Sequence, residues 1–390
     1  MNRPARFLLL AGLMALVACD QTEEEPPTPV AAVSYSPVAI ESVPGWNADN
    51  LSEALPAWRH SCQKILGFQP TRELGPGVGT AGDWQGPCQQ LASVADGDTP
   101  ALRAYLEENF LALHVTGSDN PPGLFTGYFE PILEAAREKS ELFAEPIYAL
   151  PDDHVTVNLG NFDPALKGKA VVGRVQDKKL VPYRERGEID AGAITDQAQT
   201  LFWARDPLDV FILQVQGSGI VELPDGARQR IGFAGHNGHG YGSLGRWLIE
   251  QGELPANRAA WEDIRGWLEA NPDRARSALA VNRRYIFFRE LDGDGPLGAA
   301  GVPLTAERSM AVDTKHVPLN VPVWLDIEHP DGKTRLQRLM LAQDVGSAIK
   351  GVVRGDFYWG TGRAALDKAG RMKSTGSYYI VVPKTVIPAS

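Results

Sequence analysis

Residues 341–360 read LAQDVGSAIKGVVRGDFYWG, and this stretch indicates the fold and the chemistry of the chain more strongly than any other. It contains Asp344 and Asp356 in glycine-rich settings, and a third aspartate, Asp313, ends the earlier segment SMAVD. Short apolar runs precede the aspartates, so we expect their carboxyl groups at the ends of β-strands. Aspartate beside glycine is also common in ordinary turns, and composition alone does not separate the two interpretations.

The neighbours that follow Asp356 are aromatic, namely Phe357, Tyr358 and Trp359. A carboxyl group that is partly removed from water, with a second carboxylate such as Asp344 nearby, has a raised pKa because its charged form is disfavoured. Such a group stays protonated near neutral pH and can serve as a general acid. The rings of Tyr358 and Trp359 suit either the apolar faces of sugar rings or packing in the core, and we treat both residues as candidate substrate contacts.

Further candidate ligand-binding side chains lie in two upstream stretches, residues 126–131 (TGYFEP) and 209–219 (DVFILQVQGSG). We expect the first stretch to be a loop bounded by glycine and proline. In the second, alternation over residues 210–216 predicts a strand with two glutamines on one face, where they need partners unless that face is solvated. The candidates are Thr126, Tyr128, Glu130, Gln214, Gln216 and Ser218.

Two motifs resemble cofactor-binding or metal-binding sites, but the residues around them do not fit such sites. Residues 240–245 (GYGSLG) match the GxGxxG pattern of dinucleotide-binding loops, but the segment before them, GFAGHNGH, is no buried strand. His236 and His239 are three residues apart, whereas zinc needs three or four ligands and neither an HExxH motif nor a cysteine-rich segment accompanies them. We predict no cofactor and no metal, and we interpret His236 as a hydrogen-bonding partner of a sugar or of the backbone.

The N-terminus is typical of an exported protein. Arg3 and Arg6 make the first residues positively charged, and eleven apolar residues (7–17) follow them. Eleven residues are too few to span a membrane, so we interpret residues 1–18 as a signal peptide. Residues 16–19 (LVAC) resemble a bacterial lipobox, in which Cys19 is diacylated and anchors the chain to a membrane. A plain secretory signal is the alternative. Asp20 resembles the inner-membrane retention signal of enteric lipoproteins.

Composition and the remaining cysteines agree with an exported globular protein. The 390 residues include 38 lysines and arginines against 48 acidic residues, and a net charge of −10 makes a nucleic-acid partner unfavourable. The 40 glycines and 29 prolines favour turn-rich β structure. Cys62 and Cys88 form an even pair in an oxidising compartment, which predicts a disulfide, with two buried thiols as the alternative.

Periodicity predicts a mainly β protein with some helices, arranged as barrels rather than as a long parallel sheet. Residues 20–37 read as an acidic, proline-containing tether. We predict helices over 51–66, 101–114, 244–251 and 261–270, and strands over 146–150, 210–216, 219–223, 285–291, 310–313, 321–327, 336–343 and 378–382.

Residues 341–360, together with TGYFEP, DVFILQVQGSG and GFAGHNGHGYGSLGRWLI (232–249), resemble the membrane-bound lytic murein transglycosylase A family from about residue 50 to 385. The resemblance implies a double-psi β-barrel built from residues 46–130 and 285–390, a smaller inserted β domain over 131–284, and a lipidated tether over 19–45. It implies that Asp356 is the catalytic acid, with Asp344 and Asp313 as supporting aspartates.

The resemblance also implies the substrate, the peptidoglycan strand, cut at the MurNAc-β-1,4-GlcNAc bond without water to give 1,6-anhydroMurNAc ends. It favours the outer membrane and admits murein synthases as partners; the oligomeric state is open. Two other functions fit the residues. One is a glycoside hydrolase in which Asp356 and a second aspartate act as a carboxylate pair, and the other is a cell-wall binding lipoprotein without catalysis.

Overall fold

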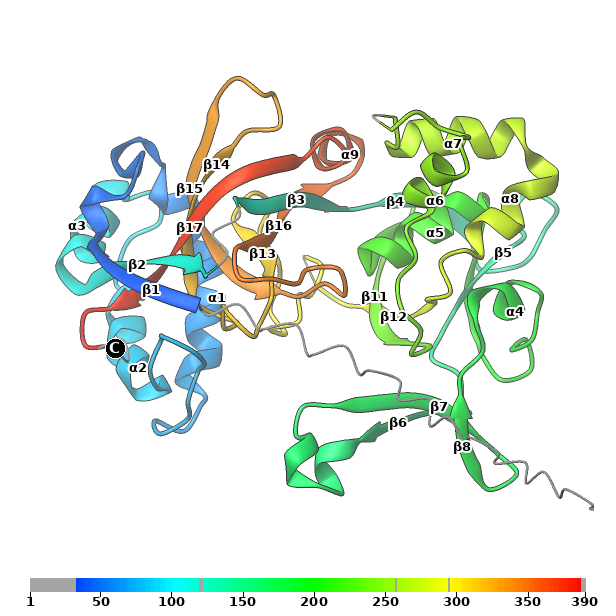
Figure 1. Cartoon of the computed structure of the whole chain (residues 1–390), viewed down its shortest axis with the longest axis horizontal. Coiled ribbons are helices and arrows are strands. Elements are labelled where there is room, and N and C mark those ends of the chain that lie inside the picture. Colours follow the sequence, from blue (N-terminus) through cyan, green and yellow to red (C-terminus); the bar gives the residue numbers. More distant parts are fainter. Residues whose placement is uncertain (1–32, 119–121, 257, 294, 387–390) are drawn as a thin grey trace, which may run out of the picture. The chain divides into compact units, whose positions relative to one another are not determined.

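The structure is a computed structural model that describes residues 33–118, 122–256, 258–293 and 295–386 (Figure 1). The predicted signal peptide, Cys19 and Asp20 lie outside the described residues. The strands of the described chain form three β-sheets, with helices packed on the larger two. The fold is mainly β with some helices, as the sequence predicts.

The largest sheet closes on itself. Its strands follow the order β1-β2-β17-β14-β15-β13-β16-β3, and a further pairing of β17 with β3 joins the last six into a closed barrel. The pairs β13–β15 and β16–β3 are parallel, whereas the other barrel pairs are antiparallel. The strands are β1 (Val33–Ala39), β2 (Phe110–Gly117), β3 (Gly123–Glu130), β13 (Ser309–Val312), β14 (Pro322–Glu328), β15 (Arg335–Asp344), β16 (Arg354–Thr361) and β17 (Lys373–Pro383).

The second sheet is built from the middle of the chain. It has the order β12-β11-β10-β4-β9-β5, and a separate three-stranded sheet, β6-β7-β8, follows β5 in the chain. The strands are β4 (Ile132–Ala136), β5 (Glu145–Tyr148), β6 (His154–Asn158), β7 (Ala170–Gln176), β8 (Lys179–Pro182), β9 (Thr200–Ala204), β10 (Ser218–Glu222), β11 (Arg228–His236) and β12 (Ile286–Leu291). Because β12 pairs with β11, the second sheet extends past residue 284, where the sequence placed the end of the inserted domain.

Helices cover both large sheets. The helices α1 to α3 precede β2, α4 to α8 belong to the segment of the second sheet, and α9 follows β16 (Figure 1). They are α1 (Leu55–Leu66), α2 (Ala81–Leu91), α3 (Thr99–Asn109), α4 (Arg186–Asp190), α5 (Pro207–Gln216), α6 (Leu244–Glu250), α7 (Trp261–Ala270), α8 (Pro272–Leu279) and α9 (Arg363–Ala369).

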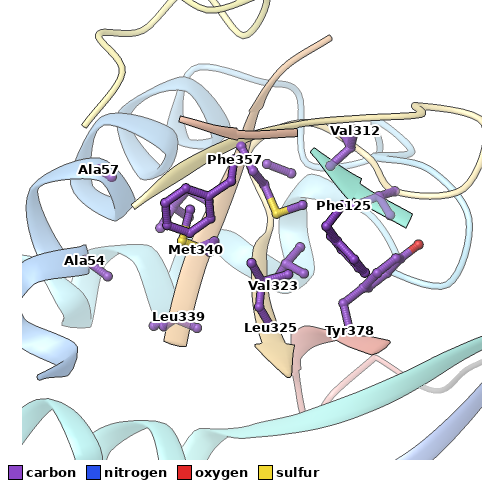
Figure 2. Packing of buried hydrophobic residues seen from close by; sticks show 14 of the residues in the cluster. Ala54, Ala57, Phe125, Val312, Val323, Leu325, Leu339, Met340, Phe357 and Tyr378 are labelled. Carbon is purple, nitrogen blue, oxygen red and sulfur yellow. The ribbon is translucent and has the colours of Figure 1, made fainter. Parts of the chain in front are cut away.

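The barrel is filled by apolar side chains that alternate along its strands. Phe125 of β3 meets Tyr378 of β17 with ring centroids 6.2 Å apart, and Val312, Val323 and Phe357 pack in the same cluster (Figure 2). Because alternate residues of a strand face opposite sides, the residues next to Phe357, Asp356 and Tyr358, point out of the barrel interior. The barrel core therefore fixes the face on which the aspartates lie.

The predicted disulfide is present. Cys62 of α1 and Cys88 of α2 are bonded, with their Cα atoms 5.2 Å apart, and both cysteines are buried. The bond holds together two of the helices that pack beside the barrel, and a covalent cross-link of this kind restricts the unfolded chain.

Four predictions of local structure are wrong. Residues 126–130, expected in a loop, belong to strand β3. Residues 210–216 belong to helix α5, not to a strand: Asp206 caps its N-terminus, Pro207 occupies the first turn and Gly217 ends it. Residues 110–114 are part of β2 rather than of a helix. The tether is shorter than predicted, because residues 33–39 form β1, which pairs with β2 over its whole length.

Candidate active site

Asp344 and Asp356 lie on the two strands that flank β13. Asp344 ends β15, Asp356 is the third residue of β16, and both pair in register with Ala311 of β13. Neighbouring strands are about 4.8 Å apart, so the two aspartates are separated by roughly two strand spacings. The sheet thus places two carboxyl groups side by side, although Asp356 lies within a strand and not at the end that the sequence suggested.

The carboxyl group of Asp356 has one side-chain hydrogen bond. Thr126, its neighbour in register on β3, donates its hydroxyl to Oδ1 of Asp356 at 2.6 Å, and Arg354 donates to the hydroxyl of Thr126 at 2.9 Å. Burial raises the pKa of Asp356 to about 6, although the Thr126 hydrogen bond and the Arg354 charge lower it; the nearby Asp344 also raises it. Asp356 therefore titrates close to neutral pH, as a general acid requires.

Asp344 is held by backbone groups. Its Oδ1 accepts the N–H of Ala299 at 2.9 Å. Burial raises its pKa above the ordinary value, against the effect of the N–H groups of Ala299 and Val345. Among the described residues, no lysine or arginine forms an ion pair with Asp344 or Asp356, so neither carboxyl group is neutralised by a direct cationic contact.

Two tyrosines extend the same face. Tyr128 of β3 pairs in register with Tyr358 of β16, and their ring centroids are 5.2 Å apart. The hydroxyl oxygen of Tyr128 is buried and has no hydrogen-bond partner among the described residues. Burial, followed by the charges of Asp344 and Asp356, raises the pKa of Tyr128 well above its ordinary value. Tyr128 is therefore a neutral hydroxyl close to both carboxyl groups, and its interaction with Asp344 lowers the pKa of that carboxyl group, against the effect of burial.

A cavity of about 670 Å³ opens at Asp344. It is lined from the barrel by Asp344 and the loop that follows it, and from the second sheet by residues of α5, β10, β11 and β12. Four candidates from the sequence line it together: Gln214, Gln216, Ser218 and His236. The prediction that these residues belong to one site thus agrees with their positions, even though the predicted strand is a helix.

The end of α5 explains how the polar side chains gather. Gly217 adopts φ 83°, a left-handed conformation that glycine takes readily, and the chain turns at once into β10. Gln216 accepts the N–H of Phe129 at 3.0 Å, which ties α5 to the end of β3. Gln214 is only 5 % exposed, and its Oε1 has no hydrogen-bond partner in the described part of the chain.

Large apolar side chains with unusually high exposure surround the same cavity. Phe233 is 48 % exposed and Val345 42 %, and Tyr241 and Leu297 are exposed to a similar degree; all four line the cavity. Exposed apolar side chains gathered at a concave site are typical of ligand binding. These residues could not be predicted from the sequence, because isolated exposed apolar positions have no pattern there.

His236 lies at the rim of the cavity as a neutral side chain. Its Nδ1 accepts the N–H of Gly238 at 2.9 Å. Burial, together with the charges of Arg284 and His154, lowers the pKa of His236 to about 4. The bond to the backbone agrees with one of the two predicted roles of His236. Among the described residues, no group of three or more His, Cys, Asp or Glu side chains is arranged to hold a metal ion.

Two predicted substrate contacts are wrong. Glu130 is fully buried, and it accepts hydrogen bonds from Arg230 at 2.7 Å and from Thr361 at 2.7 Å. Trp359 is 5 % exposed, belongs to the barrel core and donates its ring N–H to Met372. Both side chains have structural partners and are inaccessible to a substrate. Tyr358 is also buried, at 2 % exposed, and its ring packs beside that of Tyr128.

Asp313 is a buried side chain that does not contact the other two aspartates. Its carboxylate accepts the N–H of Gly351 at 2.9 Å and that of Lys315 at 3.2 Å. Gly351 belongs to the loop between β15 and β16, and residues of this loop line the cavity. Asp313 therefore positions the loop that connects the strands of Asp344 and Asp356.

Comparisons with known proteins agree with this architecture. Residues 124–289 match the MltA specific insert domain and residues 308–382 match the 3D domain. Membrane-bound lytic murein transglycosylase A of Escherichia coli K12 is 30 % identical over 295 residues, covering 74 % of this chain and 72 % of that protein. This chain belongs to the membrane-bound lytic murein transglycosylase A family.

Solved structures of the family superpose on nearly the whole chain. MltA from Neisseria gonorrhoeae in its monoclinic form has a TM-score of 0.79 at 32 % identity, covering 93 % of this chain and 97 % of that one. Escherichia coli MltA with bound chitohexaose has a TM-score of 0.66 at 26 % identity, covering 90 % and 94 %. The relatives are named as membrane-bound, and within the described residues no helix has the length and apolarity to cross a membrane.

Proposed function

We propose that this protein is a peptidoglycan lytic transglycosylase that cleaves the MurNAc-β-1,4-GlcNAc bond and forms 1,6-anhydroMurNAc ends. Family membership supports the reaction class. The observation that carries the assignment of residues is Asp356, whose pKa is raised to about 6. Asp356 does not line the cavity itself, but Asp344, two strands away in the sheet, does. A family structure binds chitohexaose, an oligosaccharide of the same β-1,4 linkage type.

In the first step, Asp356 acts as a general acid. Its protonated carboxyl group donates the proton to the glycosidic oxygen as the bond to the anomeric carbon of MurNAc breaks. Positive charge develops on that carbon, and the negative charge of Asp344 lies two strands away to stabilise it. Before the step, the same charge helps to keep Asp356 protonated.

In the second step, the ionised Asp356 acts as a base. It accepts the proton of the MurNAc 6-hydroxyl while that oxygen forms a bond to the anomeric carbon. The carboxyl group returns to its protonated state and no water is consumed. One carboxyl group can serve both steps because a pKa near 6 leaves both protonation states accessible near neutral pH.

The remaining site residues bind and orient the strand. The unpartnered Oε1 of Gln214 can accept an N–H from an acetamido group, and the buried hydroxyl of Tyr128 can bond a sugar oxygen close to the two carboxyl groups. Phe233 and Tyr241 offer apolar surface to the faces of sugar rings. Asp313 acts indirectly, by positioning the loop beside Asp344.

We further propose that the mature chain is attached by lipid at Cys19 to the periplasmic side of a bacterial membrane. The lipobox-like segment supports this anchor, the family favours the outer membrane, and Asp20 favours the inner membrane. Murein synthases are candidate partners.

The test is incubation of a soluble form that begins after Cys19 with purified sacculi, followed by the mass of the released products. Transglycosylation gives anhydro ends that are lighter by one water than the reducing ends of a hydrolase. Reducing ends would favour the carboxylate-pair hydrolase, with Asp344 as the base. Binding to sacculi without any release would favour a non-catalytic cell-wall protein. Asp356→Asn is the control, and it should release product far more slowly than the wild type.

A further inference from the structure

The wall of the cavity carries a net positive charge, whereas the whole chain carries a net negative charge. The whole sequence carries ten more acidic than basic side chains. The described residues that line the cavity include four cationic side chains and a single acidic one, Asp344. The cations are Arg186, Arg284, Arg289 and Lys350. A concave site that concentrates positive charge in an acidic protein attracts an anionic group.

Two of these cations are exposed and lack an anionic partner. Within the described part of the chain, neither Arg289 nor Lys350 forms a salt bridge or a side-chain hydrogen bond, and both are exposed. The next residue after Arg289 on β12, Glu290, is already paired with Arg137. Since alternate residues of a strand point to opposite sides, that pair lies on the other face. The positive charge of Arg289 is therefore available to bind an anionic ligand.

Arg284 supports the same conclusion. Its side chain donates a hydrogen bond to the carbonyl oxygen of His239 at 3.2 Å, and burial lowers its pKa. No acidic side chain of the described residues forms an ion pair with it. The adjacent Arg283, which does not line the cavity, is paired with Glu185. The guanidinium of Arg283 thus finds a carboxylate in the protein, whereas that of the neighbouring Arg284, on the cavity wall, bonds to a backbone carbonyl.

We infer that Arg289 and Lys350 bind carboxylates carried by the MurNAc substituents of the glycan strand, either the lactyl carboxylate or those of the stem peptide. This inference rests on the proposed function and specifies which strands the site prefers. The planar guanidinium of Arg289 suits bidentate binding of a carboxylate, and Lys350 supplies a second charge. Neither side chain contributes to the shifted pKa of Asp344 or Asp356, so their role is in binding and not in proton transfer.

The test compares three ligands in the double variant Arg289→Gln/Lys350→Gln of the soluble chain. The ligands are peptide-bearing glycan strands, strands stripped of peptide by an amidase, and chitohexaose, which has no carboxylate. The matched control is Arg371→Gln/Lys333→Gln, which removes two exposed cations that do not line the cavity. Initial rates give KM and kcat for the first two ligands, and calorimetry gives Kd for all three.

For the cavity variant we expect KM for peptide-bearing strands to rise about tenfold with kcat unchanged, because two ion pairs at a partly exposed site are lost. The Kd for chitohexaose should change less than about twofold. Loss on peptide-bearing strands alone identifies the carboxylates of the stem peptide, because the lactyl group of those strands is an amide. Loss on stripped strands as well shows that the lactyl carboxylate, which the amidase frees from that amide, is also bound. An unchanged KM, or equal weakening for chitohexaose, would overturn the inference. If the wild-type chain cleaves nothing, the proposed function fails, and the three Kd values still test the inference.

Discussion

Buried charged side chains at the two ends of strand β13 differ in their partners. At its start, Arg308 is 2 % exposed and donates two hydrogen bonds to Asp49, each 2.8 Å long, with further bonds to Glu53 and to the carbonyl oxygens of Asn50 and Leu339. Near its other end, Asp344 and Asp356 flank the strand, and their direct bonds come from backbone N–H groups and one hydroxyl.

This difference in partners distinguishes a structural ion pair from a candidate active site. A carboxylate that faces a guanidinium stays ionised and holds segments together. Arg308 accordingly lowers the pKa of Glu53, an exposed carboxylate beside the buried pair of Arg308 with Asp49. A carboxyl group without such a partner has a raised pKa and can exchange a proton near neutral pH, as the pKa of Asp356 indicates. The presence or absence of a cationic partner thus distinguishes the carboxyl groups that stabilise the fold from those that can react.

The largest effect should come from removing the proton donor. Asp356→Asn should lower the rate of anhydro-muropeptide release by about a thousandfold, because an amide cannot donate or accept the transferred proton. The measurement is product release from sacculi by chromatography and mass. A variant that retains more than about a tenth of the wild-type rate would remove Asp356 from the mechanism.

The same variant should be more stable than the wild type above neutral pH. Folding raises the pKa of Asp356 from 3.8 to about 6, so its stabilising contribution is complete below the lower value and is lost as the pH rises through the higher one. At about pH 8 we expect Asp356→Asn to unfold with a free energy about 1–2 kcal/mol larger than wild type, and the difference should disappear below about pH 4. A variant that is less stable at both pH values would show that the low activity reflects misfolding.

The structural pair should respond in the opposite way. Arg308→Met leaves the buried carboxylate of Asp49 without its cation and should lower the free energy of unfolding by about 3–5 kcal/mol. Urea denaturation measures this loss, and the double variant Arg308→Met/Asp49→Leu should recover most of it. Arg205→Ala, which breaks an exposed pair with Glu134, should cost less than about 0.5 kcal/mol. Equal losses for the buried and exposed pairs would contradict the comparison.

Sequence reasoning identified the elements whose patterns are local. The disulfide and most barrel strands follow from cysteine parity and apolar alternation, whereas the roles of the aspartates came from the family resemblance. The segment 210–216 misled the analysis, because its polar residues alternate as on a strand while the side chains of α5 are buried on nearly every side. The caps Asp206 and Gly217 are a local signal for a helix that the prediction from alternation did not use.

The composition of the site could be predicted only in part. Gln214, Gln216, Ser218 and His236 were found because polar residues in glycine-rich stretches stand out in the sequence. Arg289 and Lys350 were missed, since they are 61 positions apart and only the tertiary fold brings both to one cavity. The partners of Glu130 were likewise unpredictable, because Arg230 lies 100 residues away.

The pH dependence of activity should shift in opposite directions when the two neighbours of Asp356 are changed. The activity that requires protonated Asp356 should fall as the pH rises above about 6. Thr126→Val removes a hydrogen bond that favours the ionised form, so the pKa of Asp356 and this decline should move to higher pH. Asp344→Asn removes a negative charge that favours the protonated form, so they should move to lower pH.

The profile of kcat/KM against pH measures both shifts. Thr361→Val is the matched control, since Thr361 lies on the same strand but donates its hydroxyl to Glu130. It should leave the decline where the wild type has it. Shifts of Thr126→Val and Asp344→Asn in the same direction would mean that the contacts of Asp356 do not set its pKa.

The smallest effect concerns the apolar wall of the cavity. Phe233 is 48 % exposed at the cavity, and Phe162 is 79 % exposed away from it. Phe233→Ala should raise KM for glycan strands about fivefold with little change in kcat, because an aromatic face that covers a sugar ring contributes roughly 1 kcal/mol. Phe162→Ala should leave KM unchanged, and neither variant should change the free energy of unfolding by more than about 0.5 kcal/mol. If both variants raised KM equally, the exposure of an aromatic ring alone would explain the effect. If only Phe233→Ala raises KM, the apolar surface at the cavity binds the ligand, just as the carboxyl groups without a cationic partner react with it.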